Sequence, residues 1–214
     1  GLKVKAPYLL TDMAADAVAL LDYLGIERAH VVGVSMGGMI AQEMAIGFPE
    51  RVLSLTSIMS TTGSSKVGQP EPFAIKLFRQ KRPDGREAVI DATIAGRRVL
   101  SGGYFDEAGI REFATRSFDR SYRPEVSLKH LTAVVASRDR TEALEALAVP
   151  TLVIHGRKDP LVNIDGGEAT ATAIPDATFV AFDEMAHDLP YELWPEYVRR
   201  IAGHAKAATS RDLS

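Results

Sequence analysis

The sequence contains no cysteine among its 214 residues, which excludes disulfide bonds, thiolate metal ligands and a cysteine nucleophile together. No apolar run approaches the 18 or so residues of a membrane-spanning helix. Positive charge is not in excess, because 25 basic residues face 28 acidic ones and the net charge is −3. We therefore expect neither a membrane span nor a nucleic-acid partner, and a cytoplasmic location is the default expectation.

Motifs for metals and phosphates are also missing. No two histidines are spaced as His-x-x-x-His, and the zinc motif H-E-x-x-H is absent. The glycine-rich stretch "GVSMGG" lacks the Lys-Ser/Thr ending of a phosphate-binding loop and the spacing of a G-x-G-x-x-G turn. The sequence thus predicts a protein without a metal ion or another cofactor.

The first part of the chain alternates helical and strand-like stretches. Residues 8–25 have apolar side chains at three- and four-residue steps, which predicts a helix with Thr11 as its N-cap. The valine-rich run 29–35 predicts a strand buried on both faces. A helix should follow and end near Pro49, before a second strand over 52–60.

The same alternation returns near the other end. Strands are predicted over 149–156 and 177–183, with a helix over 163–175 between them and a last helix from 194 onward. Strands that alternate with helices favour a parallel sheet with right-handed crossovers. We therefore predict an α/β fold.

The middle of the chain breaks this alternation, because helical periodicity and dense charge replace the strand signals. We interpret residues 63–138 as a helical cap inserted over the sheet. Residues 1–62 and 139–214 would then be the two parts of one α/β core, the first with a nucleophile and the second with an acid and a base.

The candidate nucleophile is Ser35, in the pentapeptide "GVSMG" between a predicted strand and a predicted helix. In G-x-S-x-G the tight turn strains the serine backbone and exposes its oxygen, and small residues are needed on both sides. Gly33 and Gly37 meet this demand. The backbone N–H of Met36, at the start of the helix, is the candidate oxyanion donor.

The candidate acid and base each follow a later strand. Asp159 lies three residues past Gly156, and His187 lies just past the strand 177–183. Catalytic groups gather at the carboxyl edge of an open parallel sheet, and the order Ser, acid, His is typical of such sites. The sequence therefore predicts a triad of Ser35, Asp159 and His187.

Each of these residues also has a simpler interpretation. His187 alone would be an ordinary loop histidine, and Asp159 before Pro160 would be a turn former. The positions of Ser35, Asp159 and His187 all fit one catalytic arrangement, which favours the catalytic interpretation. The other titratable groups fit less well: His155 is expected to be a packed or supporting histidine, and Asp188 a solvated loop charge.

Three stretches carry a resemblance to a known family: "HVVGVSMGGMIAQEMA", "VPTLVIHGRKDPLV" and "DEMAHDLP". They resemble the α/β-hydrolase superfamily, and the chain looks most like bacterial serine esterases related to aclacinomycin methylesterase. The resemblance implies an α/β-hydrolase fold with a helical cap, and the roles of nucleophile, acid and base for Ser35, Asp159 and His187.

The chain departs from the family at two places. The family commonly has G-x-G-H at the catalytic histidine, whereas Glu184 and Ala186 hold the glycine positions here. The family also begins with further strands and a His-Gly loop that donates a second oxyanion N–H, and this sequence shows neither. We therefore expect a fragment, a proteolysed product or a chain whose first part is not included.

The expected activity is hydrolysis of a carboxylic ester through an acyl-enzyme, with a small-molecule ester as the only predicted partner. The alternatives are a carbon–carbon bond hydrolase, a perhydrolase or acyltransferase on the same fold, and a ligand-binding receptor with little turnover. The sequence does not choose the ester or the oligomeric state.

Overall fold

A computed structural model describes residues 6–79 and 83–212 of the chain. Over this part the centre is a parallel four-stranded sheet in the order β1-β2-β3-β4. The strands are β1 (Ala29–Val34), β2 (Val52–Ile58), β3 (Thr151–Gly156) and β4 (Thr178–Phe182). Val34 pairs with Ile58 and Ile58 with Ile154, so three strand ends meet at one edge of the sheet.

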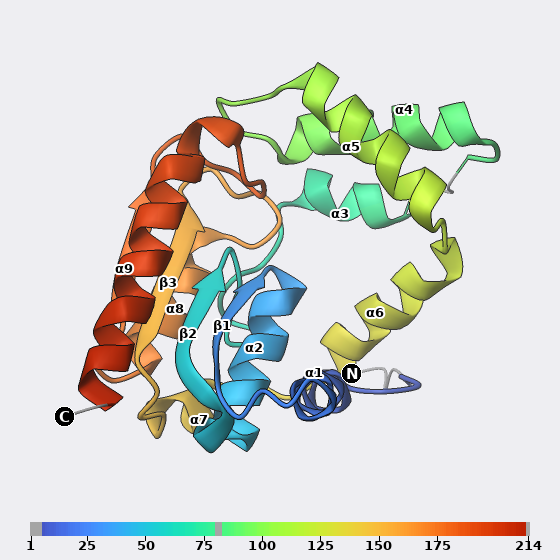
Figure 1. Ribbon diagram of the computed structural model, residues 1–214. Helices are drawn as coiled ribbons and strands as arrows, with labels where there is room; N and C mark the ends of the chain where they lie inside the picture. Colours follow the sequence, from blue (N-terminus) through green and yellow to red (C-terminus); the bar gives the residue numbers. More distant parts are fainter. Residues whose placement is uncertain (1–5, 80–82, 213–214) are drawn as a thin grey trace.

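Helices cover both faces of the sheet (Figure 1). One face packs against α1 (Leu10–Tyr23), α2 (Met36–Gly47), α7 (Thr141–Glu145) and α8 (Ile164–Ala173) in a single apolar cluster. The other face packs against α9 (Trp194–Asp212), whose Tyr197 lies in a second cluster with Ile154 and Val180. Two short 3-10 helices, Pro49–Arg51 and Tyr191–Leu193, precede β2 and α9. The predicted α/β layers are found.

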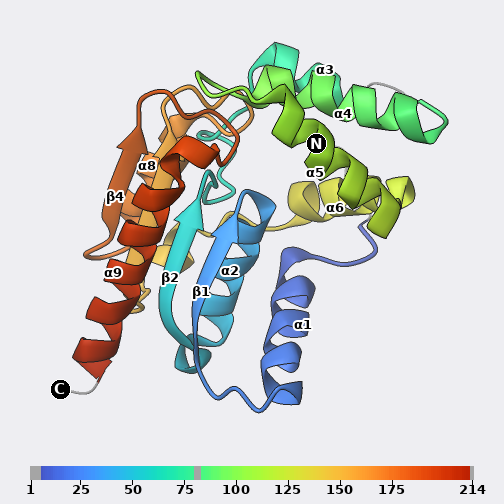
Figure 2. The ribbon, with the colours of Figure 1, turned by 45° about the horizontal axis from the view of Figure 1, so that its top comes forward.

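The middle of the chain forms α3 (Pro72–Arg79), α4 (Arg86–Leu100), α5 (Glu107–Arg120) and α6 (Pro124–Ala136). α3, α4 and α5 lie beyond the carboxyl ends of the strands, and α6 runs back from them to a point near α1, as Figures 1 and 2 show from two directions. Ile90, Ile94 and Ala114 form a small apolar cluster of their own. The helical content agrees with the sequence, while the division into cap and core stays a prediction.

Two predictions were wrong in detail. β1 is not buried on both faces, since Val32 is 46% and Val34 36% exposed. The reason is its place at the edge of the sheet, where α9 packs on β2 and β3 instead. Thr11 is not the N-cap of α1: Leu9 holds that position, and the Asp12 carboxylate accepts its N–H at 2.7 Å.

A buried arginine ties α2 to the chain that follows β2. Arg140 is almost fully buried and donates to Gln42 Oε1 and to the Thr61 carbonyl, both at 2.9 Å. Burial lowers the pKa of Arg140 to about 10, and the nearby Glu43 carboxylate acts in the opposite direction. Glu43 is itself buried and paired with Arg138 at 3.0 Å. This network fixes the helix that follows Ser35.

Replacement of this arginine should destabilise the whole domain. We expect Arg140→Met to lower the free energy of unfolding by about 3 kcal/mol, because it leaves buried acceptors without donors. Arg111→Met, which breaks the exposed ion pair with Asp91, is the matched control and should change it by less than about 1 kcal/mol. Urea unfolding of both variants measures the difference, and equal effects would contradict the network's role.

Candidate active site

The turn between β1 and α2 holds Ser35 in a strained backbone conformation. Its φ of 55° and ψ of −119° lie where residues other than glycine are rare. The Ser35 N–H donates to the Ile58 carbonyl at 2.8 Å, which fixes the turn to the end of β2. Ser35 is therefore held at the carboxyl edge of the sheet.

Close approach of neighbouring atoms explains two of the three glycines around Ser35. A Cβ on Gly33 would lie 2.1 Å from the Gly37 carbonyl oxygen, and one on Gly38 would lie 2.7 Å from Ser60 Cβ. The space around Gly37 is open, with nothing within 4 Å of such a Cβ. The predicted steric demand thus holds for Gly33 but not for Gly37. The sequence argument missed Gly38, although the glycine pair was its signal.

Asp159 lies in the loop after β3 with both carboxylate oxygens engaged. Oδ1 accepts the N–H groups of Leu161 and Val162 at 2.8 and 2.9 Å. Oδ2 lies 2.8 Å from His187 Nδ1 and 3.5 Å from His155 Nε2. Burial by itself would raise the pKa of Asp159, but hydrogen bonds from these groups lower it to about 2. The carboxylate is therefore ionised at neutral pH.

His187 links the other two side chains. Its Nδ1 lies 2.8 Å from Asp159 Oδ2, and its Nε2 lies 2.9 Å from Ser35 Oγ. Because an ionised carboxylate only accepts, Nδ1 carries the ring proton and Nε2 is free to accept from the serine hydroxyl. The structure thus brings Ser35, His187 and Asp159 into one hydrogen-bonded line.

The loop that carries His187 is held by the end of α4 and by the chain that follows it. The His187 N–H donates to the Leu100 carbonyl at 2.9 Å, and the Gly103 N–H donates to the Glu184 carbonyl at 3.0 Å. A Cβ on Gly102 would lie 2.0 Å from that same Glu184 oxygen. The Gly-Gly pair at 102–103, which the sequence argument did not use, marks this close approach.

The other histidines are not part of the hydrogen-bonded line of Ser35, His187 and Asp159. His155 is fully buried in β3, as expected of a packed or supporting histidine. His30, His130 and His204 contact Ser54, Tyr8 and the Pro150 carbonyl, respectively.

Asp188 is not the solvated charge that was predicted. It is half-buried and its Oδ1 has no hydrogen-bond partner. Burial raises the pKa of the Asp188 carboxyl, and a hydrogen bond from Ser101 opposes this. The loop at 100–103 and the His187 loop therefore bury a carboxyl group between them.

The Met36 N–H lies in the first turn of α2, where backbone N–H groups have no acceptor within the helix. It directly follows Ser35, at the end of α2 where the helix dipole favours negative charge. It can serve as an oxyanion donor.

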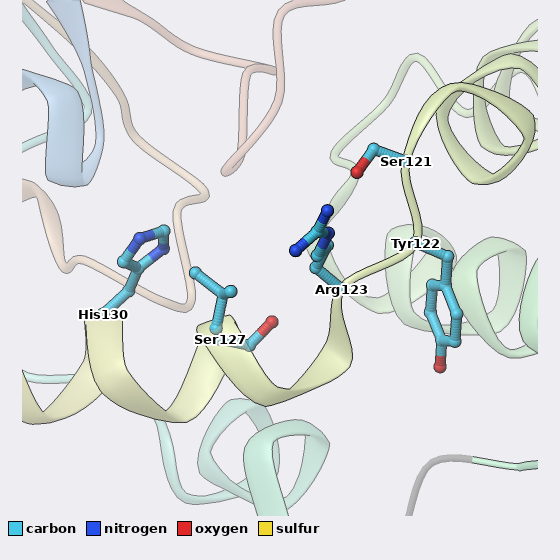
Figure 3. Close-up of a pocket in the computed structure, with 6 residues that line it drawn as sticks. Ser121, Tyr122, Arg123, Ser127 and His130 are labelled. Carbon is cyan, nitrogen blue, oxygen red and sulfur yellow. The ribbon is translucent and has the colours of Figure 1, made fainter.

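Two cavities of the described residues lie outside this group. One of about 400 Å³ is lined by α6 and the short segment between α5 and α6, where Ser121, Arg123, Ser127 and His130 extend from the ribbon in Figure 3. The other, of about 680 Å³, lies at the amino ends of β3 and β4, opposite Ser35.

Within residues 6–79 and 83–212, no helix is both long and apolar enough to cross a membrane. The same residues contain no group of three or more histidine and acidic side chains placed to hold a metal ion. Ser35, His187 and Asp159 therefore form the reactive group with the most complete geometry in this part of the chain.

Comparison with known proteins identifies the class. Residues 5–192 match the family described as alpha/beta hydrolase fold, and the chain belongs to this family. The resemblance read from the three sequence stretches is thereby confirmed at the level of the family.

Individual relatives differ in their named activities. The chain is 27% identical to rhodomycin D methylesterase DnrP of Streptomyces peucetius, over 95% of this chain and 75% of that protein. It is 32% identical to a 2-hydroxy-6-oxononadienedioate/2-hydroxy-6-oxononatrienedioate hydrolase of Paraburkholderia phymatum, over 81% of this chain but 60% of that protein.

Solved structures show the same fold. The hydrolase BphD from Rhodococcus sp. strain RHA1 aligns with a TM-score of 0.73 and 20% identity over 94% of this chain and 74% of that one. Est816, described as an N-acyl homoserine lactone degrading enzyme, aligns with a TM-score of 0.70 and 26% identity over 92% of this chain and 75% of that one.

The glycine contacts predict a sharp contrast between two alanine variants. Gly33→Ala should lower the free energy of unfolding by about 2 to 3 kcal/mol, because its Cβ would overlap the Gly37 carbonyl. The methyl group of Gly37→Ala has free space, and alanine forms helices better than glycine. We therefore expect the free energy of unfolding to change by less than about 1 kcal/mol. Thermal or urea unfolding compares them, and equal destabilisation would contradict the observed packing.

The low pKa of Asp159 predicts a pH-dependent contribution to stability. A carboxyl group with a pKa of about 2 in the folded chain and about 3.8 when unfolded stabilises the fold above pH 4, by about 2 kcal/mol. This contribution is lost as the pH falls through the folded-state value. The difference in unfolding free energy between the parent and Asp159→Asn should therefore shrink by about 1 kcal/mol from pH 6 to pH 3. A constant difference would show that the pKa of Asp159 is the same in the folded and the unfolded chain.

Proposed function

We propose that the protein is a serine hydrolase that cleaves carboxylic esters through an acyl-enzyme. The observation that carries the proposal is the hydrogen-bonded line from Ser35 Oγ through His187 to Asp159 Oδ2. It is supported by the family membership and by the similarity to rhodomycin D methylesterase.

The chemistry follows from the positions of the protons. Ser35 Oγ attacks the carbonyl carbon of the ester while its proton passes to His187 Nε2. The ring is then an imidazolium, which the Asp159 carboxylate stabilises through Nδ1–H. The Met36 N–H donates to the oxyanion of the tetrahedral intermediate.

Collapse of this intermediate releases the alcohol, which takes the proton from His187 Nε2. A water molecule then attacks the acyl carbon on Ser35 while His187 Nε2 takes its proton. The second tetrahedral intermediate collapses, Ser35 Oγ takes the proton back from His187, and the acid leaves. Burial of Asp159 strengthens its attraction for the imidazolium, because water does not screen the pair.

A carbon–carbon bond hydrolase is the second candidate function. The 32% identity to a 2-hydroxy-6-oxononadienedioate/2-hydroxy-6-oxononatrienedioate hydrolase favours it, because the same three side chains would serve either reaction. Perhydrolase, acyltransferase and receptor functions remain alternatives without a specific observation in their favour.

The proposal predicts that activity depends on one hydroxyl group. Ser35→Ala should lower kcat for a chromogenic short-chain ester by about 10⁴ or more and leave the fold intact. The parent should also form a covalent adduct with a fluorophosphonate that the variant does not form. Turnover with a methyl ester compared with turnover of a vinylogous 1,5-diketone separates the two candidate functions.

Ser117→Ala, at an exposed serine of α5, is the matched control and should keep both the adduct and the turnover. Equal turnover by Ser35→Ala and the parent would rule out Ser35 as the nucleophile. If the fluorophosphonate does not label the parent protein, the proposal that it is a serine hydrolase is ruled out.

A further inference from the structure

We propose that His155 is a positioning residue, which holds the Asp159 loop from inside the sheet and thereby orients His187 toward Ser35. This inference rests on the proposed function, since it concerns the same reaction. It assigns a role in that reaction to a buried imidazole that does not itself reach Ser35.

His155 lies one residue before the end of β3 and is fully buried. Its Nε2 lies 2.8 Å from the Val162 carbonyl oxygen and 3.5 Å from Asp159 Oδ2. Both neighbours are acceptors, so Nε2 carries the ring proton and donates it to Val162. The positive edge of this N–H also faces the carboxylate.

The loop is thereby held at two points on a single residue. The Val162 N–H donates to Asp159 Oδ1 at 2.9 Å, while the Val162 carbonyl accepts from His155 at 2.8 Å. The carboxylate cannot rotate without breaking the first bond, and the loop cannot move away from the strand without breaking the second. Oδ2 is left directed at His187.

The other ring nitrogen of His155 makes no hydrogen bond. His155 Nδ1 is buried without a hydrogen-bond partner, and a Cβ on Gly167 would lie 2.3 Å from it. A second proton on the ring would therefore be buried against the backbone of α8 with no acceptor. Of the two imidazoles beside Asp159, only His187 is placed to take the proton from Ser35.

Two amide variants test the role because they differ only in reach. The glutamine amide nitrogen can occupy the place of Nε2, whereas the asparagine amide nitrogen reaches only the place of Nδ1. We expect His155→Gln to keep kcat for a chromogenic ester within about threefold of the parent. His155→Asn should lose about tenfold or more in kcat with less than a twofold change in KM, because the acid and base lose their alignment.

Rates are expressed per active site, counted by fluorophosphonate labelling to completion. A merely structural residue would change the number of sites or the melting temperature but not kcat per site. His30→Leu, which removes a histidine hydrogen bonded to Ser54 at the start of β1, is the control for such a loss. It should leave kcat per site unchanged. Should the asparagine variant fail to fold, His155→Leu takes its place, with the same expected loss.

Unchanged kcat per site in His155→Asn, or an equal loss in the glutamine and asparagine variants, would overturn the positioning role. Absence of labelling in the parent protein would instead refute the proposed serine hydrolase. Labelling of the parent protein therefore distinguishes the failure of the positioning role from the failure of the proposed function.

Discussion

The arrangement of the candidate site depends on keeping one negative charge inside the protein. A buried carboxylate is costly unless hydrogen-bond donors replace the lost water. Asp159 has such donors on every side: two backbone N–H groups of its own loop, the His187 ring and the edge of His155. Since this charge orients His187, loss of the donors would also release the imidazole from Ser35.

The strain at Ser35 requires a rigid surrounding, because an unfavourable backbone conformation persists only where neighbours enforce it. The Ile58 carbonyl holds the turn from one side, and the close contact of Gly33 with Gly37 holds it from another. Arg140 fixes the helix that follows through Gln42. Ser35 is thus positioned by bonds to residues far apart in the sequence.

The helical middle of the chain contributes to the site as well as lying beside it. The end of α4 and the segment after it hold the His187 loop through Leu100 and Gly103, so a change in these helices would be transmitted to His187. A relative named a methylesterase is 27% identical to this chain, and one named a 2-hydroxy-6-oxononadienedioate/2-hydroxy-6-oxononatrienedioate hydrolase is 32% identical.

Much of the fold and the three side chains of the candidate site could be predicted from the sequence. The alternation of apolar runs with amphipathic helices follows local periodicity, and the positions of Ser35, Asp159 and His187 after three strands follow from how parallel strands align. Local patterns carry this information because strand direction decides at which edge each loop emerges.

Only the tertiary structure decided the contacts that join distant segments. It showed that Gly38 rather than Gly37 is sterically confined, that β1 is half-exposed at the edge of the sheet, and that Asp188 is half-buried. It also placed the His155 ring against the Asp159 loop and the α8 backbone. The sequence determined which groups are present and in what order they reach the sheet edge. Burial and alignment were decided by packing, because they depend on what lies opposite each residue in space.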